Sequence, residues 1–399
     1  MITRRQLLKR SLLVSLSPVV PAFLTRTAGA AETDKDGRVL VVIQLDGGND
    51  GLNTVVPYRD ENYARLRPKL KLPQDRLIKL NDELALHASM KAAGELFEHG
   101  RLTIVQGVGY PNPNRSHFRS MAIWHTARLD EAEHGQYGWL GRALDTQAAT
   151  RTGPHAVYSS LGSVPLALWG RRSATIEVKS KDELALDSPV ELLQAATSTT
   201  DECSQLARRV SVECGDAFAT CERLAPILAG QMAPGEDDGP TRLAAHLSII
   251  SALIKAGTTA RVYYAAQRGY DTHASQTYEH ARLLREFAGA VKTFLDDLAA
   301  SGLADRVLVL AFSEFGRRAA ENASEGTDHG AAAPVFIAGP NLASPIIGPA
   351  PNLSQLKDGD VEMAVDFRQV YATILRQWLG VPPAEVLGAA FDELALFRA

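Results

Sequence analysis

The chain has 399 residues, 45% of them hydrophobic, which excludes an intrinsically disordered protein and suffices for one large α/β domain or two ordinary ones. Its 42 basic and 46 acidic residues give a formal net charge of −4. This balance, without a long basic run in the sequence, argues against a protein that binds nucleic acid.

The first thirty residues have the features of an export signal. An arginine pair, Arg4-Arg5, precedes a moderately apolar stretch, and a small-residue cleavage site follows at residues 28–30. The pair and the residues after it resemble a twin-arginine signal. An amphipathic helix or an uncleaved anchor is the alternative, but the apolar stretch is short and interrupted by Ser and Pro. We therefore expect a signal peptide over 1–30, a periplasmic or secreted product, and no stable membrane span after cleavage.

Strand and helix patterns alternate in the next hundred residues. Val39–Leu45 is short, β-branched and apolar throughout, as in a buried parallel strand. A helix is predicted over 88–99, where apolar residues recur at helical spacing before Gly100. A second strand follows at Leu102–Gln106, and a loop leads to a helix that begins near Ser116. This order is the βαβ rhythm of a parallel sheet with helices on both faces.

The middle of the chain is less regular. Residues 127–240 hold short strand-like pieces at 166–169 and 174–178, a helical segment and an acidic loop, and we interpret them as an insertion or cap. The three cysteines, Cys203, Cys214 and Cys221, lie in this region. Without a C-x-x-C spacing they are not expected to bind metal, and an oxidising compartment would allow at most one disulfide among them.

The βα rhythm returns after residue 241. Helices are predicted over roughly 241–256, 278–301 and 366–379, and strands over 260–265, 306–311 and 334–338. The last helix should end at Gly380. The prediction is therefore one domain over 31–399, a doubly wound and mostly parallel sheet with helices on both faces.

Polar residues follow the predicted strands, where the carboxyl ends of an open α/β sheet form the ligand crevice. Carboxylates and imidazoles together are ligands for Zn²⁺, Mn²⁺ or Fe²⁺. A hydroxyl at a helix N-terminus could attack a phosphorus or sulfur centre, with the helix amides holding anionic oxygens. We expect six residues to converge there: Asp46, Ser116, Asp271, His273, Glu314 and His329.

Each of these residues also has a local explanation. Asp46 and Asp271 could cap turns, and Ser116 could be a plain helix N-cap. Glu314 could pair with a neighbouring arginine, and His329 could be a satisfied buried histidine. Singly these explanations are preferred, but their joint position at strand ends favours a site.

Several familiar loops are excluded by their spacing. The stretch "DGGNDG" at 46–51 superficially resembles a calcium loop but lacks the distal Glu. No GxGxxG or GxxxxGK[ST] loop follows the first strand, and no GxSxG nucleophile elbow occurs. Nucleotide binding through such loops and α/β-hydrolase chemistry are therefore not supported.

The motifs together resemble the bacterial family catalogued as domain of unknown function 1501. The resemblance runs in order over most of the chain after the signal and is weakest over 180–240. The segments that carry it are "VVIQLDGGNDGLNTVVPY", "LHASMKAAGELFEHGRLTIVQGVGYPNPNRSHF", "GYDTHASQ", "FSEFGRR" and "GTDHGAAAPVFIAG". The family looks like a distant branch of the alkaline phosphatase and sulfatase superfamily, which implies a doubly wound sheet and usually a two-metal site.

The resemblance also implies roles for particular residues. Asp46 matches the superfamily's acidic metal ligand after the first strand, and Ser116 matches the region of its nucleophile. The remaining implied metal ligands are Asp271, His273, Glu314 and His329. The stretch "SEFG" stands where "SDHG" is usual, so Phe315 replaces a histidine. A one-metal site, a more oxygen-rich site and a degenerate binding site all remain open.

The sequence thus predicts an exported metal-dependent hydrolase of phosphate or sulfate esters. It would use one or two divalent ions, and its partner would be an anionic small molecule or a glycan ester. The alternative is a periplasmic or surface protein of the same fold that has lost catalysis and binds a glycan or a protein. The candidate substrate-binding residues are Asn49, Asn114, Arg115, His117 and Arg317.

Overall fold

The computed structural model describes residues 37–398 except 131, 133, 134, 148–154, 161 and 179–242. The predicted signal peptide and the three cysteines lie outside the described residues. Within the described part, no helix is long and apolar enough to cross a membrane.

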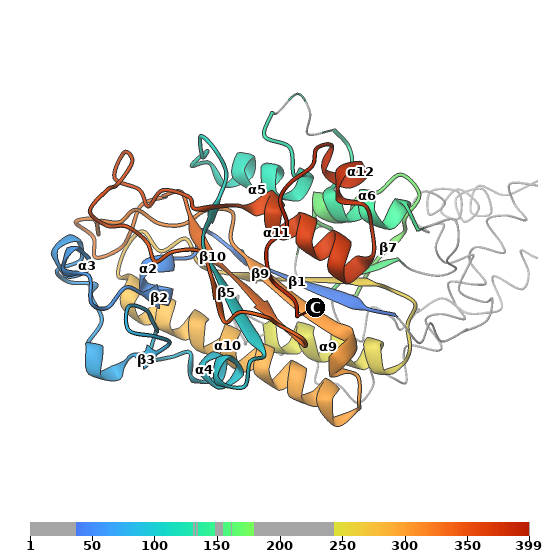
Figure 1. Ribbon diagram of the computed structural model, residues 1–399, viewed down its shortest axis with the longest axis horizontal. Coiled ribbons are helices and arrows are strands. Elements are labelled where there is room, and N and C mark those ends of the chain that lie inside the picture. Colours follow the sequence, from blue (N-terminus) through green and yellow to red (C-terminus); the bar gives the residue numbers. More distant parts are fainter. Residues whose placement is uncertain are drawn as a thin grey trace, which may run out of the picture.

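A mixed sheet, nine-stranded over the described residues, runs through the centre of the molecule (Figure 1). In spatial order its strands are β11 (Ile346–Ile347), β5 (Leu102–Gly109), β10 (Ala333–Ala338), β9 (Val307–Phe312), β1 (Val39–Asp46), β8 (Val262–Arg268), β6 (Ala156–Tyr158) and β7 (Thr175–Glu177), with β12 (Val365–Asp366) also on β5. All pairings are parallel except those of β10 with β5 and β9. The predicted mostly parallel sheet is confirmed.

Helices cover both faces of this sheet (Figure 1). One layer contains α4 (Lys91–Glu98), α9 (Leu243–Lys255) and α10 (Gln276–Ala300), and the other contains α5 (His117–Thr126), α6 (Trp139–Asp145), α11 (Phe367–Thr373) and α12 (Pro383–Leu387). Alternate residues of β1 serve the two layers: Val41 and Ile43 pack in one core, Leu40 and Val42 in the other. The doubly wound α/β class therefore follows from a strand that is apolar on both sides.

The end of the last helix also matches the prediction. After α11 the chain continues as a π-helical segment, Ile374–Leu379, and stops at Gly380 in the left-handed region with φ +68°. A residue without a Cβ takes this conformation at no steric cost.

The described part of the region predicted as an insertion or cap belongs to the main domain, and its residues 179–240 lie outside the described part of the chain. Its described strands, β6 and β7, extend the main sheet beside β8, and α6 belongs to one of the helix layers. The predicted strand-like piece at 166–169 is a 3₁₀ turn, Leu166–Leu168. Strands of three residues carry too little periodicity for sequence patterns to place them in a sheet.

A smaller unit packs beside the main sheet at one end of the molecule (Figure 1). It contains a second sheet of β2 (Val55–Val56), β4 (Ala85–Leu86) and β3 (Ile78–Lys79), with the helices α2 (Gly51–Thr54) and α3 (Glu61–Leu66) and the 3₁₀ turn Gln74–Arg76. Leu52, Val56 and Tyr63 belong to its own small core. A further 3₁₀ turn, Ala304–Arg306, precedes β9.

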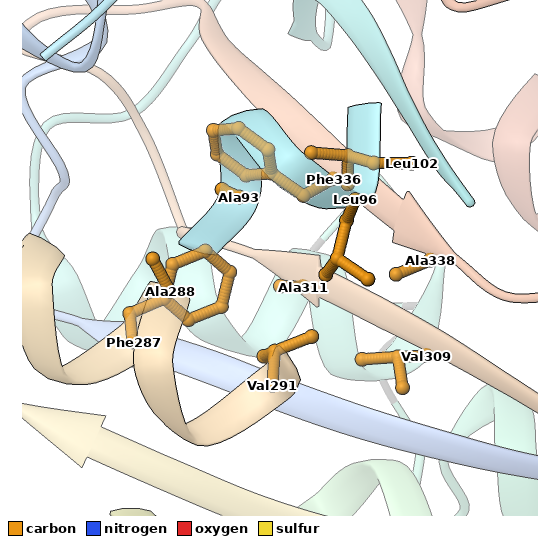
Figure 2. Close-up of a pocket in the computed structure, with 10 residues that line it drawn as sticks. All are labelled: Ala93, Leu96, Leu102, Phe287, Ala288, Val291, Val309, Ala311, Phe336 and Ala338. Atoms are coloured by element: carbon orange, nitrogen blue, oxygen red, sulfur yellow. The ribbon is translucent and has the colours of Figure 1, made fainter. Parts of the chain in front are cut away.

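The main core contains a small cavity between α4, α10 and the sheet (Figure 2). It has a volume of about 10 Å³ and purely apolar walls, among them Leu96, Phe287 and Phe336. This is the size of a single water probe, and no polar group could hold a water there. The cavity is therefore a packing gap and not a ligand site.

The antiparallel strand β10 explains how residues before a strand reach the site. Its first residue, Ala333, pairs with Val108 near the carboxyl end of β5. The loop that precedes β10 therefore lies at the same sheet edge as the loops that follow β1, β8 and β9. Residues 328 and 329 reach that edge from the start of a strand, and Asp271 and His273 reach it from the end of one.

Candidate metal centre

The glycine-rich turn after β1 is shaped by close contact with two other segments. A Cβ on Gly47, at φ +121°, would lie 2.5 Å from the amide nitrogen of Asp271. A Cβ on Gly48, at φ +81°, would lie 2.4 Å from the ring of Phe315. Both positions therefore need glycine for conformation and for space. The turn holds the loop after β8 against the loop after β9.

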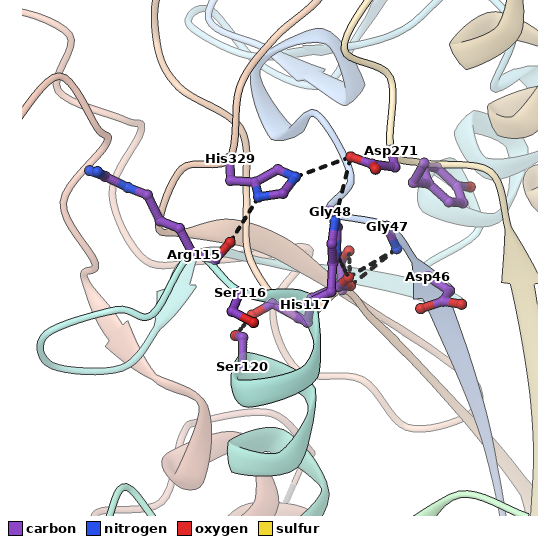
Figure 3. Close-up of polar contacts among 12 residues, drawn as sticks. Asp46, Gly47, Gly48, Arg115, Ser116, His117, Ser120, Asp271 and His329 are labelled. Carbon is purple, nitrogen blue, oxygen red and sulfur yellow. Dashed lines mark hydrogen bonds and ion pairs between the residues drawn. The ribbon is translucent and has the colours of Figure 1, made fainter.

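Three predicted ligands meet at this edge, and we call Asp271, His273 and His329 the ligand cluster (Figure 3 shows Asp271 and His329). Nε2 of His273 lies 2.9 Å from Nε2 of His329. Each of these nitrogens is 3.1 Å from Oδ1 of Asp271. A fourth atom, Nε2 of His117, lies 3.5 Å from the same Oδ1. His117, Asp271 and His329 each offer an atom within 4.8 Å of the others.

The other nitrogen of each ring is fixed by an oxygen. Nδ1 of His117 lies 2.7 Å from the Glu314 carboxylate, and Nδ1 of His273 lies 3.2 Å from that of Asp328. Nδ1 of His329 lies 2.8 Å from the carbonyl oxygen of Arg115. Since ionised carboxylates and carbonyls only accept hydrogen bonds, each Nδ1 carries a proton. In the neutral form of each ring, the Nε2 lone pair on the side of Asp271 is then available to a cation.

The residues of the ligand cluster fit a divalent cation. Neutral imidazoles would repel each other with two Nε2 lone pairs 2.9 Å apart, and a cation between them relieves that repulsion. Ligand bonds of about 2.0–2.2 Å place neighbouring ligand atoms roughly 2.8–3.6 Å apart, from octahedral to tetrahedral geometry, and the separations of 2.9 and 3.1 Å lie in that range. Nitrogen and carboxylate ligands suit Zn²⁺, Mn²⁺ or Fe²⁺.

Glu314 was predicted to be a metal ligand, but its carboxylate does not face the ligand cluster. Its side chain is fully buried and accepts hydrogen bonds from the Gly47 amide at 3.0 Å and the Ser313 hydroxyl at 3.2 Å. Its Oε1 also bonds His117. The carboxylate therefore lies behind a histidine, the usual place for a group that orients a metal ligand.

Asp46 also has partners of its own. Its Oδ1 accepts a hydrogen bond of 3.3 Å from Gln44, and Arg268 lies 3.8 Å from its Oδ2. Gln44 is held in turn by Tyr264, whose hydroxyl donates to it at 2.6 Å. Burial, and next the charge of Glu314, raise the pKa of Asp46. The structure does not bring Asp46 into the ligand cluster.

Arg317 is buried beneath the ligand cluster and joins the three loops. Its guanidinium donates to the Gly48 carbonyl at 2.7 Å, the Thr327 carbonyl at 2.8 Å and Oδ1 of Asp271 at 2.7 Å. Partial burial acts to raise the pKa of Asp271, but the hydrogen bond and the charge of Arg317 outweigh it and lower that pKa to about 2. With its side chain fully buried, Arg317 positions Asp271 and is not placed to contact a substrate, contrary to prediction.

Two other predicted substrate residues also have protein partners. The Arg115 guanidinium pairs with the buried Asp360, and its side chain points away from the cluster in Figure 3. Asn114 accepts a hydrogen bond of 2.9 Å from the Ser116 amide. Ser116 is the N-cap residue of α5, and its exposed hydroxyl makes no capping hydrogen bond. The Ser116 side chain is therefore exposed at the N-terminus of α5 and is not used to cap the helix.

Asn49, the fifth predicted substrate residue, lies in a second polar group that we call the buried network. Asp50 and Arg67 form an ion pair of 2.5 Å with no exposed side-chain surface. Gln276 donates to Asp50, and Nε2 of His280 lies 3.0 Å from Oδ1 of Asn49. Asn49 is fully buried, so no substrate contact is open to it. Asp50, in the glycine-rich turn after β1, therefore contributes to the packing of the protein interior.

Sequence reasoning missed two features of the site. His117 was expected to bind substrate, yet its Nε2 faces Asp271; its position as the first residue of α5, one place after the N-cap, was the available signal. Asp328 was not among the predicted site residues, and it anchors His273. Its place beside His329 in sequence gave no indication of which ring it would meet.

A family model covers most of the chain. The family described as protein of unknown function DUF1501 matches residues 37–392. The chain belongs to this family. No curated protein matches it in sequence. The family match confirms the resemblance noted from the motifs.

Solved structures provide more distant matches. The C-terminal periplasmic domain of EptC from Escherichia coli, in complex with Zn, is 9% identical, with 77% of this chain and 74% of that chain covered and a TM-score of 0.39. The PsFucS1 sulfatase from Pseudoalteromonas sp. is 10% identical, with 96% and 74% covered and a TM-score of 0.43. The lipoteichoic acid synthase LtaP from Listeria monocytogenes is 11% identical, with 87% and 80% covered and a TM-score of 0.28. The fold class stated above rests on the sheet itself.

Proposed function

We propose that the protein is an exported metal-dependent hydrolase of phosphate or sulfate esters. The observation that carries the proposal is the ligand cluster, in which two Nε2 atoms 2.9 Å apart both lie 3.1 Å from Oδ1 of Asp271. When both rings are neutral with the proton on Nδ1, a cation between the two Nε2 atoms makes this arrangement favourable. The ligand cluster would hold that ion, which would polarise the ester's phosphoryl or sulfuryl oxygens when bound.

The N-terminus of α5 supplies the other parts that such a reaction needs. Ser116 is exposed, and its hydroxyl makes no capping hydrogen bond. It directly precedes His117, and in this proposal it acts as the nucleophile. The first-turn amides of this ten-residue helix and its dipole would hold anionic oxygens of the ester. In this proposal Arg317 holds Asp271 ionised and in place.

The location of the protein follows from its leader sequence. The arginine pair Arg4-Arg5 and the small residues at 28–30 are typical of twin-arginine export, which carries folded proteins across the membrane. Replacing Arg4 and Arg5 with Lys should trap the precursor in the cytoplasm. Unchanged export of that variant would reject this part of the proposal.

One observation favours a second candidate, a protein of the same fold that binds a glycan or partner without catalysis. Asp46 and Glu314, two of the five predicted metal ligands, have other partners and lie outside the ligand cluster. A site that has lost part of a two-ion centre could keep its ion for structure or binding alone.

Metal analysis with an ester panel separates the two. Protein purified through its native export route is assayed for bound metal and for hydrolysis of aryl and sugar phosphates and sulfates. We expect bound Zn, Mn or Fe and turnover of at least one ester. Ser116→Ala should keep the metal and lose turnover, with Ser275→Ala as a control at another helix N-cap. Metal-loaded protein inactive on all esters would support the binding protein.

A further inference from the structure

Outside the ligand cluster, His117, the first residue of α5, has a ring nitrogen without a hydrogen-bond partner. Nε2 of His117 is buried and has no hydrogen-bond partner. The ring sits between two others, with centroids 4.9 Å from Phe315 and 4.3 Å from His329. A buried polar atom without a partner costs free energy, so a group that binds this nitrogen in the working protein is expected.

An ordinary ion pair does not satisfy this atom. If His117 were simply a cation paired with Glu314, its Nε2–H would still need an acceptor. Oδ1 of Asp271, at 3.5 Å, makes no hydrogen bond with it. A small cation shared with Asp271 would use the Nε2 lone pair, because the 3.5 Å between Nε2 and Oδ1 of Asp271 lies within the roughly 2.8–3.6 Å that separates ligand atoms around one ion.

Glu314 is placed to orient this ring. It lies 2.7 Å from Nδ1 of His117 and is itself fixed by the Gly47 amide and the Ser313 hydroxyl. The carboxylate is fully buried and already faces the Gly47 amide and the His117 ring, so it would act on the ion through His117. This is the carboxylate–histidine pairing that fixes the tautomer of a metal-binding ring.

We propose that His117 is a fourth protein ligand of the ion, oriented by Glu314, so that the site holds one ion with three nitrogen ligands and one oxygen ligand. The inference rests on the metal centre of the proposed function and not on hydrolysis. Asp46 takes no part, since Gln44 and Arg268 already face its carboxylate. The half-exposed side chains of Asp271 and His273 leave the solvent side of the ion open.

The test is a titration of metal-free, signal-cleaved protein with Zn²⁺ and, for its visible spectrum, Co²⁺. Wild type should bind one ion per chain. His117→Ala should weaken binding more than about 10-fold and alter the Co²⁺ spectrum through loss of a nitrogen ligand, and Glu314→Gln should weaken it about 10- to 100-fold. The matched controls are His99→Ala, at an exposed position that follows α4, and Glu279→Gln, at a half-buried position on α10, and both should bind as wild type does.

A second variant covers the case in which His117→Ala does not fold. His117→Phe with Glu314→Gln keeps a ring between Phe315 and His329 and leaves no buried charge unpaired. Wild-type affinity and an unchanged Co²⁺ spectrum in a folded His117 variant would overturn the inference and leave the proposed function standing. Two ions per chain would also overturn it. No binding by wild type would reject both.

Discussion

The ligand cluster and the buried network lie at the same edge of the sheet and use the same kinds of side chain, yet their polar atoms are satisfied differently. In the buried network, the Asp50 carboxylate meets Arg67 and Gln276, and neither partner of the ion pair is exposed. In the ligand cluster, Asp271 and His273 are about half exposed and two Nε2 atoms face each other. A closed set of donors and acceptors indicates packing, and convergent lone pairs indicate a site for an ion.

The turn 46–51 contributes to both groups: Asp50 belongs to the buried network, and Gly47 and Gly48 contact the loops that carry the ligand cluster. Asp46 in this turn was predicted to be a metal ligand because it follows the first strand. Asp50 is instead the N-cap of α2 and one partner of a buried ion pair. The glycines leave space for the loops after β8 and β9 to pack closely against the turn, and these loops carry the ligands. The turn thus supports the site without supplying it.

The largest expected effect comes from opening the buried network. Arg67→Met should lower the free energy of unfolding by about 3–5 kcal/mol, because it leaves the Asp50 carboxylate buried and unpaired. The double variant Asp50→Asn with Arg67→Met should recover much of that loss. Urea denaturation of the metal-free protein measures both. A loss of under about 1 kcal/mol in the single variant would contradict the assignment of this pair to packing.

Acid should destabilise the buried network through His280. Burial lowers the pKa of this ring to about 4 in the folded protein, below its ordinary value of 6.5. The unfolded chain therefore binds a proton between pH 6.5 and pH 4 that the folded chain refuses. Stability is full above pH 6.5 and falls as the pH drops to about 4, by roughly 3 kcal/mol from this group.

The variant His280→Gln keeps an N–H donor toward Asn49 and removes the titration. Its free energy of unfolding, measured by urea at pH 7 and pH 4, should fall less with acid than that of wild type. His99→Gln, at an exposed position, is the control. Equal acid dependence of His280→Gln and wild type would show that this ring does not exclude the proton.

Removing a member of the ligand cluster should affect the metal and spare the fold. His329→Ala takes away a nitrogen that lies 3.1 Å from Asp271 and 2.9 Å from His273. We expect metal affinity to fall about 100-fold, or about 2.7 kcal/mol, with a small change in metal-free stability because the side chain is partly exposed. Calorimetric titration and denaturation of the same samples give both numbers. Lost stability with retained affinity would reverse the contrast with the buried network.

The smallest effect is expected at an anchor of the ligand cluster. Asp328 fixes Nδ1 of His273 at 3.2 Å but is largely exposed. Asp328→Ala should lower metal affinity about 10-fold, the low end for groups that orient ligands. Asp358→Ala, on an exposed loop, serves as the control. An unchanged affinity would mean that water orients His273 equally well.

The fold was largely predictable because its signals are local and strong. The apolar run from Val39 and the spaced apolar residues before Gly100 correspond to β1 and α4. The orientation of β10 was not predictable, since an apolar six-residue strand reads the same in either direction. The strand-like piece predicted at 174–178 corresponds to β7. Strands as short as β6 and β7 do not reveal from sequence that they belong to the main sheet.

The site was predictable in composition and less so in geometry. Aspartate and histidine at strand ends pointed to Asp271, His273 and His329, because strand ends converge. Whether a side chain after a strand faces the crevice depends on one loop dihedral, and Glu314 turns inward to His117. Neighbouring helix residues such as Ser116 and His117 differ in direction by about 100°, which sequence could not resolve near an uncertain helix start.

One cation is expected to bind between Asp271, His273 and His329. Anomalous diffraction from crystals of metal-loaded protein tests it most directly, using data on both sides of the metal's absorption edge. We expect one strong peak at about 2.0–2.2 Å from Oδ1 of Asp271 and from the Nε2 atoms of both histidines. A peak bound elsewhere, or Asp271 and the two histidines seen without a peak in metal-saturated crystals, would contradict it.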